Sequence, residues 1–277
     1  MKNFALIGVL IVALLVYIGA HFRSISGVEE RILRIGSECD YPPNNWEEEK
    51  ETDSNILIEN REDRYAEGYD IQIAKAVADS MGATLEVYKL NWNELIPALN
   101  KGEIDAIFSS MLDTDERKKT LAFSEPYESR LSEYGVAVNR DGKFSGARKL
   151  TDFSGANFIG QHGTNTDSAI NQIPGTVHLQ PVDSVNEMLE KLKRNEIDAI
   201  VIDTEIFNMY RQTYPSMMLI KFPKGEGFNF GYTGVCACVK KKDTKLLSEI
   251  NAALSKISQR ERQRIMDRSI AREWENF

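Results

Sequence analysis

The side chains that could bind a small charged molecule follow two similar stretches of the sequence. Both stretches contain the letters EIDAI; the first continues through FSS to Ser109 and Ser110, and the second continues through VID to Asp203. Arg117 comes shortly after the first stretch. One copy therefore offers hydroxyls and a cation, and the other offers a carboxylate. This combination suits a zwitterion held between the two copies.

Each copy is predicted to be an amphipathic helix followed by a buried strand. Apolar residues recur at helical spacing before each EIDAI, as Trp92, Leu95, Ile96 and Leu99 in the first copy and as Val185, Met188, Leu189 and Leu192 in the second. Pro97 lies inside the first pattern and weakens the case for an unbroken helix there. Ligands of open α/β sheets bind beyond the carboxyl ends of the strands, so we expect the two strand ends to face one cleft.

The rest of the chain alternates strand and helix patterns. Residues 68–82 predict a helix that ends at Gly82, residues 84–90 predict a strand, and residues 244–258 predict a last helix. Strands that alternate with helices predict an α/β fold with mainly parallel sheets. By contrast, residues 45–67 are polar and acidic without a sustained period, and we expect them to form an exposed excursion.

Composition narrows the class of protein. The chain has 277 residues, of which 42% are hydrophobic and 27% charged. Because a single core usually splits beyond about 250 residues, two domains are expected. A net charge of −8 argues against nucleic-acid binding, and 3 histidines without ligand spacing argue against a metal site. Cys39, Cys236 and Cys238 are expected to be small buried residues rather than a disulfide framework.

Residues 1–24 are predicted to be a signal peptide or an N-terminal membrane anchor. An uncharged apolar run extends from Phe4 to Ala20. The run is at the short limit for a membrane span, while the bulky Ile18 fits poorly at a cleavage site after Ala20. These features favour an anchor at residues 4–22, and the cleaved signal stays open as the alternative. Either one implies an extracytoplasmic location, at the cell surface or in the periplasm.

The order of these patterns resembles the extracytoplasmic solute-binding proteins of amino-acid ABC importers, bacterial family 3. The resemblance runs through most of the chain after the N-terminal segment, and its most specific block is WNELIPALNKGEIDAIFSSMLDTDERKKTLAFSEPY, residues 92–127. It implies a two-lobed, periplasmic-binding-protein-like clamshell of type II that acts as a monomer. Residues 31–133 plus 231–277 would form lobe 1 and residues 134–230 would form lobe 2.

The resemblance also implies roles for individual residues. Arg117 matches the arginine that binds the ligand carboxylate, and Asp203 matches the acid that accepts the α-ammonium. Tyr41 and Tyr69 match aromatic residues on either side of the ligand side chain. Glu38 stands where binders of cationic amino acids carry an acid, although glutamate also occurs there without that specificity. The other members of the implied site are Ser109, Ser110, Leu112, Thr164, Asn165 and Thr166.

The function implied is the binding of a free α-amino acid and its delivery to an ABC permease, with no catalytic residue, cofactor or metal. The amino acid would be polar and, if Glu38 acts on it, cationic. Two alternatives on the same scaffold stay open. One is a cyclohexadienyl or arogenate dehydratase, which would use a cleft carboxylate such as Glu38 as general acid. The other is a ligand-sensing module.

Overall fold

The structure is a computed structural model that describes residues 31–128, 133–223, 225–229 and 234–275. The predicted signal peptide or anchor at residues 1–24 lies outside these ranges. Within them, no helix combines the length and apolar composition that a membrane crossing requires.

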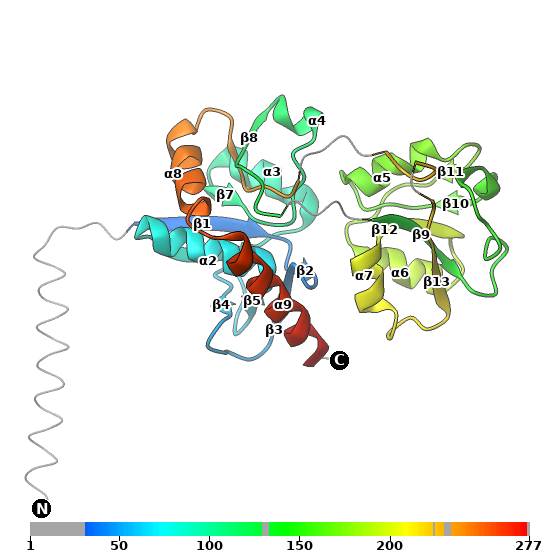
Figure 1. Cartoon of the computed structure of the whole chain (residues 1–277), viewed down its shortest axis with the longest axis horizontal. Helices are drawn as coiled ribbons and strands as arrows, with labels where there is room; N and C mark the ends of the chain where they lie inside the picture. Colours follow the sequence, from blue (N-terminus) through cyan, green and yellow to red (C-terminus); the bar gives the residue numbers. More distant parts are fainter. Residues whose placement is uncertain (1–30, 129–132, 224, 230–233, 276–277) are drawn as a thin grey trace, which may run out of the picture. The chain divides into compact units, whose positions relative to one another are not determined.

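The first sheet joins strands that lie far apart in the sequence (Figure 1). Its order is β6 (Thr84–Lys89), β1 (Ile32–Ser37), β7 (Ala106–Ile107), β14 (Cys238–Lys240) and β8 (Leu121–Phe123). β1 and β7 run parallel, with Ile35 opposite Ala106, whereas β14 runs antiparallel to both β7 and β8.

The second sheet comes from one continuous part of the chain. Its order is β11 (Val177–His178), β10 (Asn157–Phe158), β12 (Ala199–Asp203), β9 (Tyr134–Asn139) and β13 (Met217–Ile220). β10 is parallel to β11 and β12, and β9 is antiparallel to β12 and β13. Both sheets are therefore mixed, and the prediction of mainly parallel sheets was wrong. A buried strand has the same apolar run in either direction, so its sequence does not reveal its orientation.

The helices that were predicted from an apolar stripe are found at the expected positions. α2 (Tyr69–Met81) buries Ile71, Ala74 and Val77 and ends at Gly82, whose φ of 63° is the left-handed conformation that glycine adopts readily. α2 packs against α8 (Thr244–Leu254) and against α9 (Gln259–Glu275), a helix that the sequence pattern had not predicted.

The two helix–strand copies are confirmed, with one difference. The helices are α3 (Trp92–Lys101), which continues through Pro97, and α6 (Val185–Lys193). The strand after α6 is β12, as expected, but the strand after α3 is only β7. The chain leaves the sheet beyond it and turns at Ser110, which has a φ of 50°. The first copy is therefore a short strand followed by a turn rather than a strand through residue 110.

Residues 45–67 do not form an exposed excursion, and that prediction was wrong. They supply three strands of a small antiparallel sheet whose order is β2 (Asp40–Tyr41), β3 (Asn45–Glu48), β5 (Tyr65–Glu67) and β4 (Ile56–Leu57). The sheet buries Glu67, and Arg272 of α9 pairs with Glu48 at 3.0 Å and with Glu67 at 3.4 Å. The buried positions are partly charged, so they produce no apolar period in the sequence.

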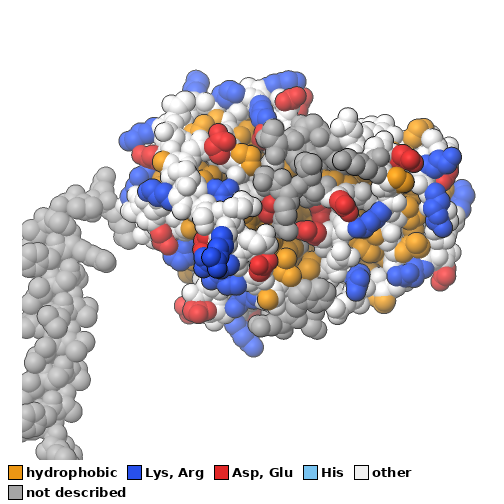
Figure 2. Space-filling model, viewed as in Figure 1, with side chains coloured by type: hydrophobic (Ala, Val, Ile, Leu, Met, Phe, Trp, Pro, Cys, Tyr) orange, Lys and Arg blue, Asp and Glu red, His pale blue; other side chains and the backbone are white. Residues whose placement is uncertain are grey.

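The remaining helices are short: α4 (Asp115–Lys118), α5 (Asn165–Ala169), α7 (Thr204–Tyr210) and two 3₁₀ turns, η1 (Leu150–Phe153) and η2 (Ile170–Gln172). The cysteines are free and buried, as predicted. Ala237 and Val239 lie in one apolar cluster and Cys238 in another, so the alternation around β14 is also confirmed. On the face shown in Figure 2, Lys and Arg side chains are dispersed among acidic and hydrophobic ones.

Candidate ligand-binding site

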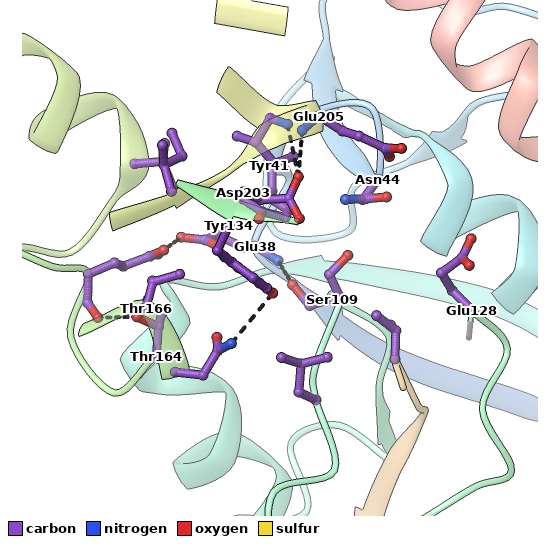
Figure 3. A pocket seen from close by; sticks show the side chains of 18 of the residues that line it. Glu38, Tyr41, Asn44, Ser109, Glu128, Tyr134, Thr164, Thr166, Asp203 and Glu205 are labelled. Carbon is purple, nitrogen blue, oxygen red and sulfur yellow. Dashed lines mark hydrogen bonds between the residues drawn. The ribbon is translucent and has the colours of Figure 1, made fainter. Parts of the chain in front are cut away.

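A cavity of about 450 Å³ lies where β7 and β12 end, with side chains from several elements directed toward it (Figure 3). Its volume is in the range of small-molecule sites, about 300–1,000 Å³. Every residue predicted for the site lines this cavity, namely Glu38, Tyr41, Tyr69, Ser109, Ser110, Leu112, Arg117, Thr164, Asn165, Thr166 and Asp203. The structure therefore brings together all the side chains that the sequence singled out.

Arg117 belongs to α4, and its guanidinium contacts carbonyl oxygens. Nη1 donates to the Leu112 carbonyl at 2.9 Å and Nη2 donates to the Gly163 carbonyl at 2.8 Å. The guanidinium carbon lies 5.3 Å from the ring centroid of Trp92. Burial lowers the pKa of Arg117, and within the described part of the chain no carboxylate opposes that effect or pairs with the guanidinium. A partly desolvated cation without a counter-ion is unfavourable, so an anion in the cavity would be stabilised here.

Asp203 ends β12 and caps α7. Its Oδ1 accepts from the backbone N–H of Glu205 at 2.7 Å and from that of Ile206 at 3.3 Å. Only 6% of the residue is exposed. A strand-end aspartate often caps the next helix, and this one does so while it borders the cavity. The cap holds the carboxylate in one orientation, as Figure 3 shows beside Glu205.

Glu38 follows β1 and is 7% exposed. Its Oε1 accepts from the Nε2 of Gln161, which also donates to the Asp183 carbonyl at 3.0 Å. The backbone N–H of Glu38 donates to the Ser109 Oγ at 2.9 Å. Burial and, to a smaller extent, the charge of the nearby Asp40 raise the pKa of Glu38 to about 8. Near pH 7 and without a bound ligand, Glu38 is therefore mainly the neutral acid.

The two predicted aromatic residues differ in their surroundings. Tyr41 packs against the apolar cluster around β12 and α6, and burial raises the pKa of its hydroxyl well above the usual value. Tyr69 is only 2% exposed, and its hydroxyl donates to the Tyr127 carbonyl at 2.8 Å. Tyr69 is thus mainly a core residue with one side on the cavity, whereas Tyr41 joins the small sheet to the second sheet's core.

The segment at the start of α5 is ordered by its own side chains. Thr164 Oγ1 donates to the Gln161 carbonyl at 2.8 Å and accepts from the Asp167 N–H at 3.1 Å. Thr166 Oγ1 lies 2.9 Å from Thr164 Oγ1, and Asn165 Nδ2 donates to the Tyr134 hydroxyl at 3.5 Å. This part of the cavity wall therefore has a defined set of donors and acceptors.

Asp70 is a cavity residue that sequence reasoning missed. It lies in the first turn of α2, is 0% exposed, and accepts from the Tyr127 hydroxyl, the Asn45 amide and the Ser110 hydroxyl at 2.7, 2.7 and 2.9 Å. Burial raises the pKa of Asp70 to about 6. A signal was available, because Asp70 falls on the same helix face as the buried Ala74, four residues later.

The charge of the cavity wall is strongly unbalanced. Its acidic residues are Glu38, Asp70, Glu128, Glu133, Asp203 and Glu205. Among the described residues that line the cavity, Arg117 is the one basic side chain. A ligand that matches this wall carries one negative group and more than one positive group.

Comparisons with known proteins show the family and the fold of the chain. Residues 33–271 match the bacterial extracellular solute-binding proteins, family 3. The arginine-binding extracellular protein ArtP of Bacillus subtilis (strain 168) is 25% identical over 238 residues, which cover 84% of each chain. A solved substrate-binding protein of an amino acid ABC transporter has a TM-score of 0.71 and 26% identity, with 86% of this chain and 98% of that chain covered. An ancestral arginine-binding protein bound to arginine has a TM-score of 0.68 and 26% identity, covering 86% and 97%. The predicted α/β fold of the type II periplasmic binding proteins is confirmed. The chain belongs to the bacterial extracellular solute-binding proteins of family 3.

Proposed function

We propose that the protein binds a free α-amino acid with a cationic side chain outside the cytoplasm and delivers it to an ABC permease, as a binding protein and not as an enzyme. One observation carries the proposal. Arg117 is a partly buried cation without a carboxylate partner among the described residues, and it lies in a cavity whose other charged residues are acidic. A molecule with one carboxylate and two cationic groups satisfies both features.

The roles of the charged residues follow from this match. Arg117 binds the ligand carboxylate, because a guanidinium can offer two parallel charge-assisted hydrogen bonds. Asp203 accepts from the α-ammonium, and Glu38 receives the side-chain cation. The relative from Bacillus subtilis is named for arginine, and the ancestral protein is bound to arginine, which supports a ligand of this class.

Residues 31–133 plus 231–277 form lobe 1 in this proposal, and residues 134–230 form lobe 2. Sheet membership supports the division, because β14 joins the strands that precede β9. Hydrogen bonds that join the two parts, such as Asn186 Nδ2 to Asp40 Oδ1 at 2.8 Å, fit a hinge that closes on the ligand. A membrane anchor at residues 4–22 and a monomeric state complete the proposal.

The test is calorimetry with the twenty amino acids, followed by variants of Arg117. We expect arginine or lysine to bind with the highest affinity. Arg117→Ala removes two charge-assisted bonds of about 1.5–3 kcal/mol each, so affinity should fall by about 10²- to 10⁴-fold. Arg117→Lys keeps the charge but loses the planar pair of donors, and should bind with intermediate affinity.

Arg268→Ala is the matched control, because the Arg268 side chain is 72% exposed and lies away from the cavity lining. Its affinity should equal that of the unmodified protein. Circular dichroism confirms that each variant is folded. Unchanged affinity in folded Arg117→Ala, or a clear preference for an acidic amino acid, would contradict the proposal.

A further inference from the structure

Asp70 occupies an unusual position for an acidic residue, because it is fully buried and yet borders the cavity. Its carboxylate gathers hydrogen-bond donors from three separate segments. Tyr127, which is 1% exposed, donates its hydroxyl, and Asn45, which is 0% exposed, donates its amide. The third donor is Ser110, at the turn that follows β7. Asp70 therefore ties the small sheet and the first sheet together directly behind the ligand cavity.

Ser110 gives both of its donors to Asp70. The hydroxyl donates to Oδ2 at 2.9 Å, and the backbone N–H of Ser110 also bonds the same carboxylate. A serine hydroxyl has one donor and two acceptor lone pairs. Because its proton is directed at Asp70, Ser110 can only accept a hydrogen bond from a group in the cavity. Its neighbour Ser109 differs, since the Ser109 Oγ accepts from the Glu38 N–H and its own proton is not used in that bond.

The Asn45 amide shows that Asp70 sets the orientation of its partners. Asn45 directs Nδ2 at the carboxylate, and its Oδ1 is buried without a hydrogen-bond partner. An unsatisfied buried carbonyl raises the free energy of the folded state. Here the hydrogen bond from the Asn45 amide to the ionised Asp70 carboxylate offsets that penalty. A carboxylate accepts only, so all of its neighbours must point their donors toward it.

We propose that Asp70 is a positioning residue that makes Ser110 a hydrogen-bond acceptor for the ligand's α-ammonium group. The inference rests on the proposed function and deepens it. An ammonium has only donors, so it fits between Ser110 and the Asp203 carboxylate. A carboxylate has only acceptors and finds no donor at Ser110, which leaves Arg117 as its site. Asp70 thereby sets which end of the amino acid lies on which side of the cavity, without contacting the ligand.

The experiment compares two ligands that differ only at the α-position. These are L-arginine and its 2-hydroxy analogue, in which a hydroxyl replaces the ammonium. Calorimetry at pH 7.5 gives the ratio of their affinities for the unmodified protein, Asp70→Asn, Ser110→Ala and the double variant. The asparagine keeps the shape of the aspartate but adds a donor, so the Ser110 hydroxyl can turn its proton toward the cavity.

We expect Asp70→Asn to lower the preference for arginine over the hydroxy analogue by about tenfold or more, the value of one hydrogen bond to a charged group. Ser110→Ala should lower it by a similar factor, and the double variant should lower it no further, because both changes remove one interaction. Tyr127→Phe is the matched control. It removes another donor from Asp70 without altering Ser110, so it can lower stability but should leave the ratio unchanged.

A purely structural role for Asp70 would weaken both ligands equally. An unchanged ratio in folded Asp70→Asn would therefore overturn the inference, as would additive effects in the double variant. If Asp70→Asn does not fold, Ser110→Ala decides alone, and an unchanged ratio there overturns the inference. The two proposals fail differently. If the unmodified protein binds no amino acid, both are wrong, whereas arginine binding that depends on Arg117 with an unchanged ratio removes only the role of Asp70.

Discussion

Because the pKa of Glu38 is raised, we expect the binding of a cationic amino acid to release a proton. The empty protein holds this buried carboxyl with a pKa of about 8, mainly because burial disfavours its charge. A ligand cation beside it stabilises the ionised form and lowers that pKa. Below pH 8, binding must therefore include the free energy of removing the proton from Glu38.

The pH dependence follows from the pKa. Removing the proton costs about 1.4 kcal/mol for each pH unit below the pKa. The association constant for arginine should rise about tenfold from pH 6 to 7 and about fivefold from pH 7 to 8. At pH 7 close to one proton should leave for each ligand bound, since the acid is mainly neutral beforehand. Asp70 has a pKa of about 6, so its titration affects the association constant only at the acidic end of this pH range.

Calorimetry in two buffers with different ionisation enthalpies measures the proton release directly. Glu38→Gln is the control, because it keeps the size of the side chain and has no proton to lose. Its affinity for arginine should be lower at pH 8 and nearly flat from pH 6.5 to 8. Arginine binding without proton release at pH 7, or equal proton release by Glu38→Gln and the unmodified protein, would contradict this role of Glu38.

Two further predictions concern stability. Burial raises the pKa of Glu38 in the folded protein above its pKa in the unfolded chain. The contribution of Glu38 to the free energy of unfolding is therefore complete below the unfolded-chain pKa and is lost as the pH rises through about 8. Urea unfolding of the empty protein should thus show a loss of about 2 kcal/mol between pH 6 and 8, and an equal loss in Glu38→Gln would contradict the cause. Arg272→Met leaves the carboxylates of Glu48 and Glu67 without their cation and should lower the free energy of unfolding by about 2–3 kcal/mol, less than for a fully buried pair because Arg272 is 28% exposed. Arg268→Met is its control and should change the free energy by less than about 0.5 kcal/mol; equal effects of the two substitutions would show that the ion pair contributes nothing.

The parts of the fold that could be predicted from the sequence are those held by apolar contacts. The stripes of α2, α3 and α6 bury the residues that their periodicity indicated, and each helix is present. The small sheet and α9 were missed because they meet through charged groups, with Arg272 between Glu48 and Glu67. Charged residues normally indicate a solvent-exposed segment. Only the tertiary structure shows that these side chains form ion pairs with one another.

The candidate site was predictable to the extent that it lies at strand ends. Asp203 and the serines after β7 line one cavity, as the rule for α/β sheets indicates. Asp70 was not predictable in the same way, because its importance depends on three donors that come from different segments. The raised pKa of Glu38 likewise depends on burial that no local pattern reveals.

A crystal structure of the protein grown with L-arginine would show whether the cavity binds a cationic amino acid and in which direction. We expect the ligand carboxylate on the Arg117 guanidinium, the α-ammonium between Asp203 and Ser110, and the side-chain guanidinium beside Glu38. An arginine bound in the reverse direction, with its carboxylate away from Arg117, or bound outside this cavity, would contradict it.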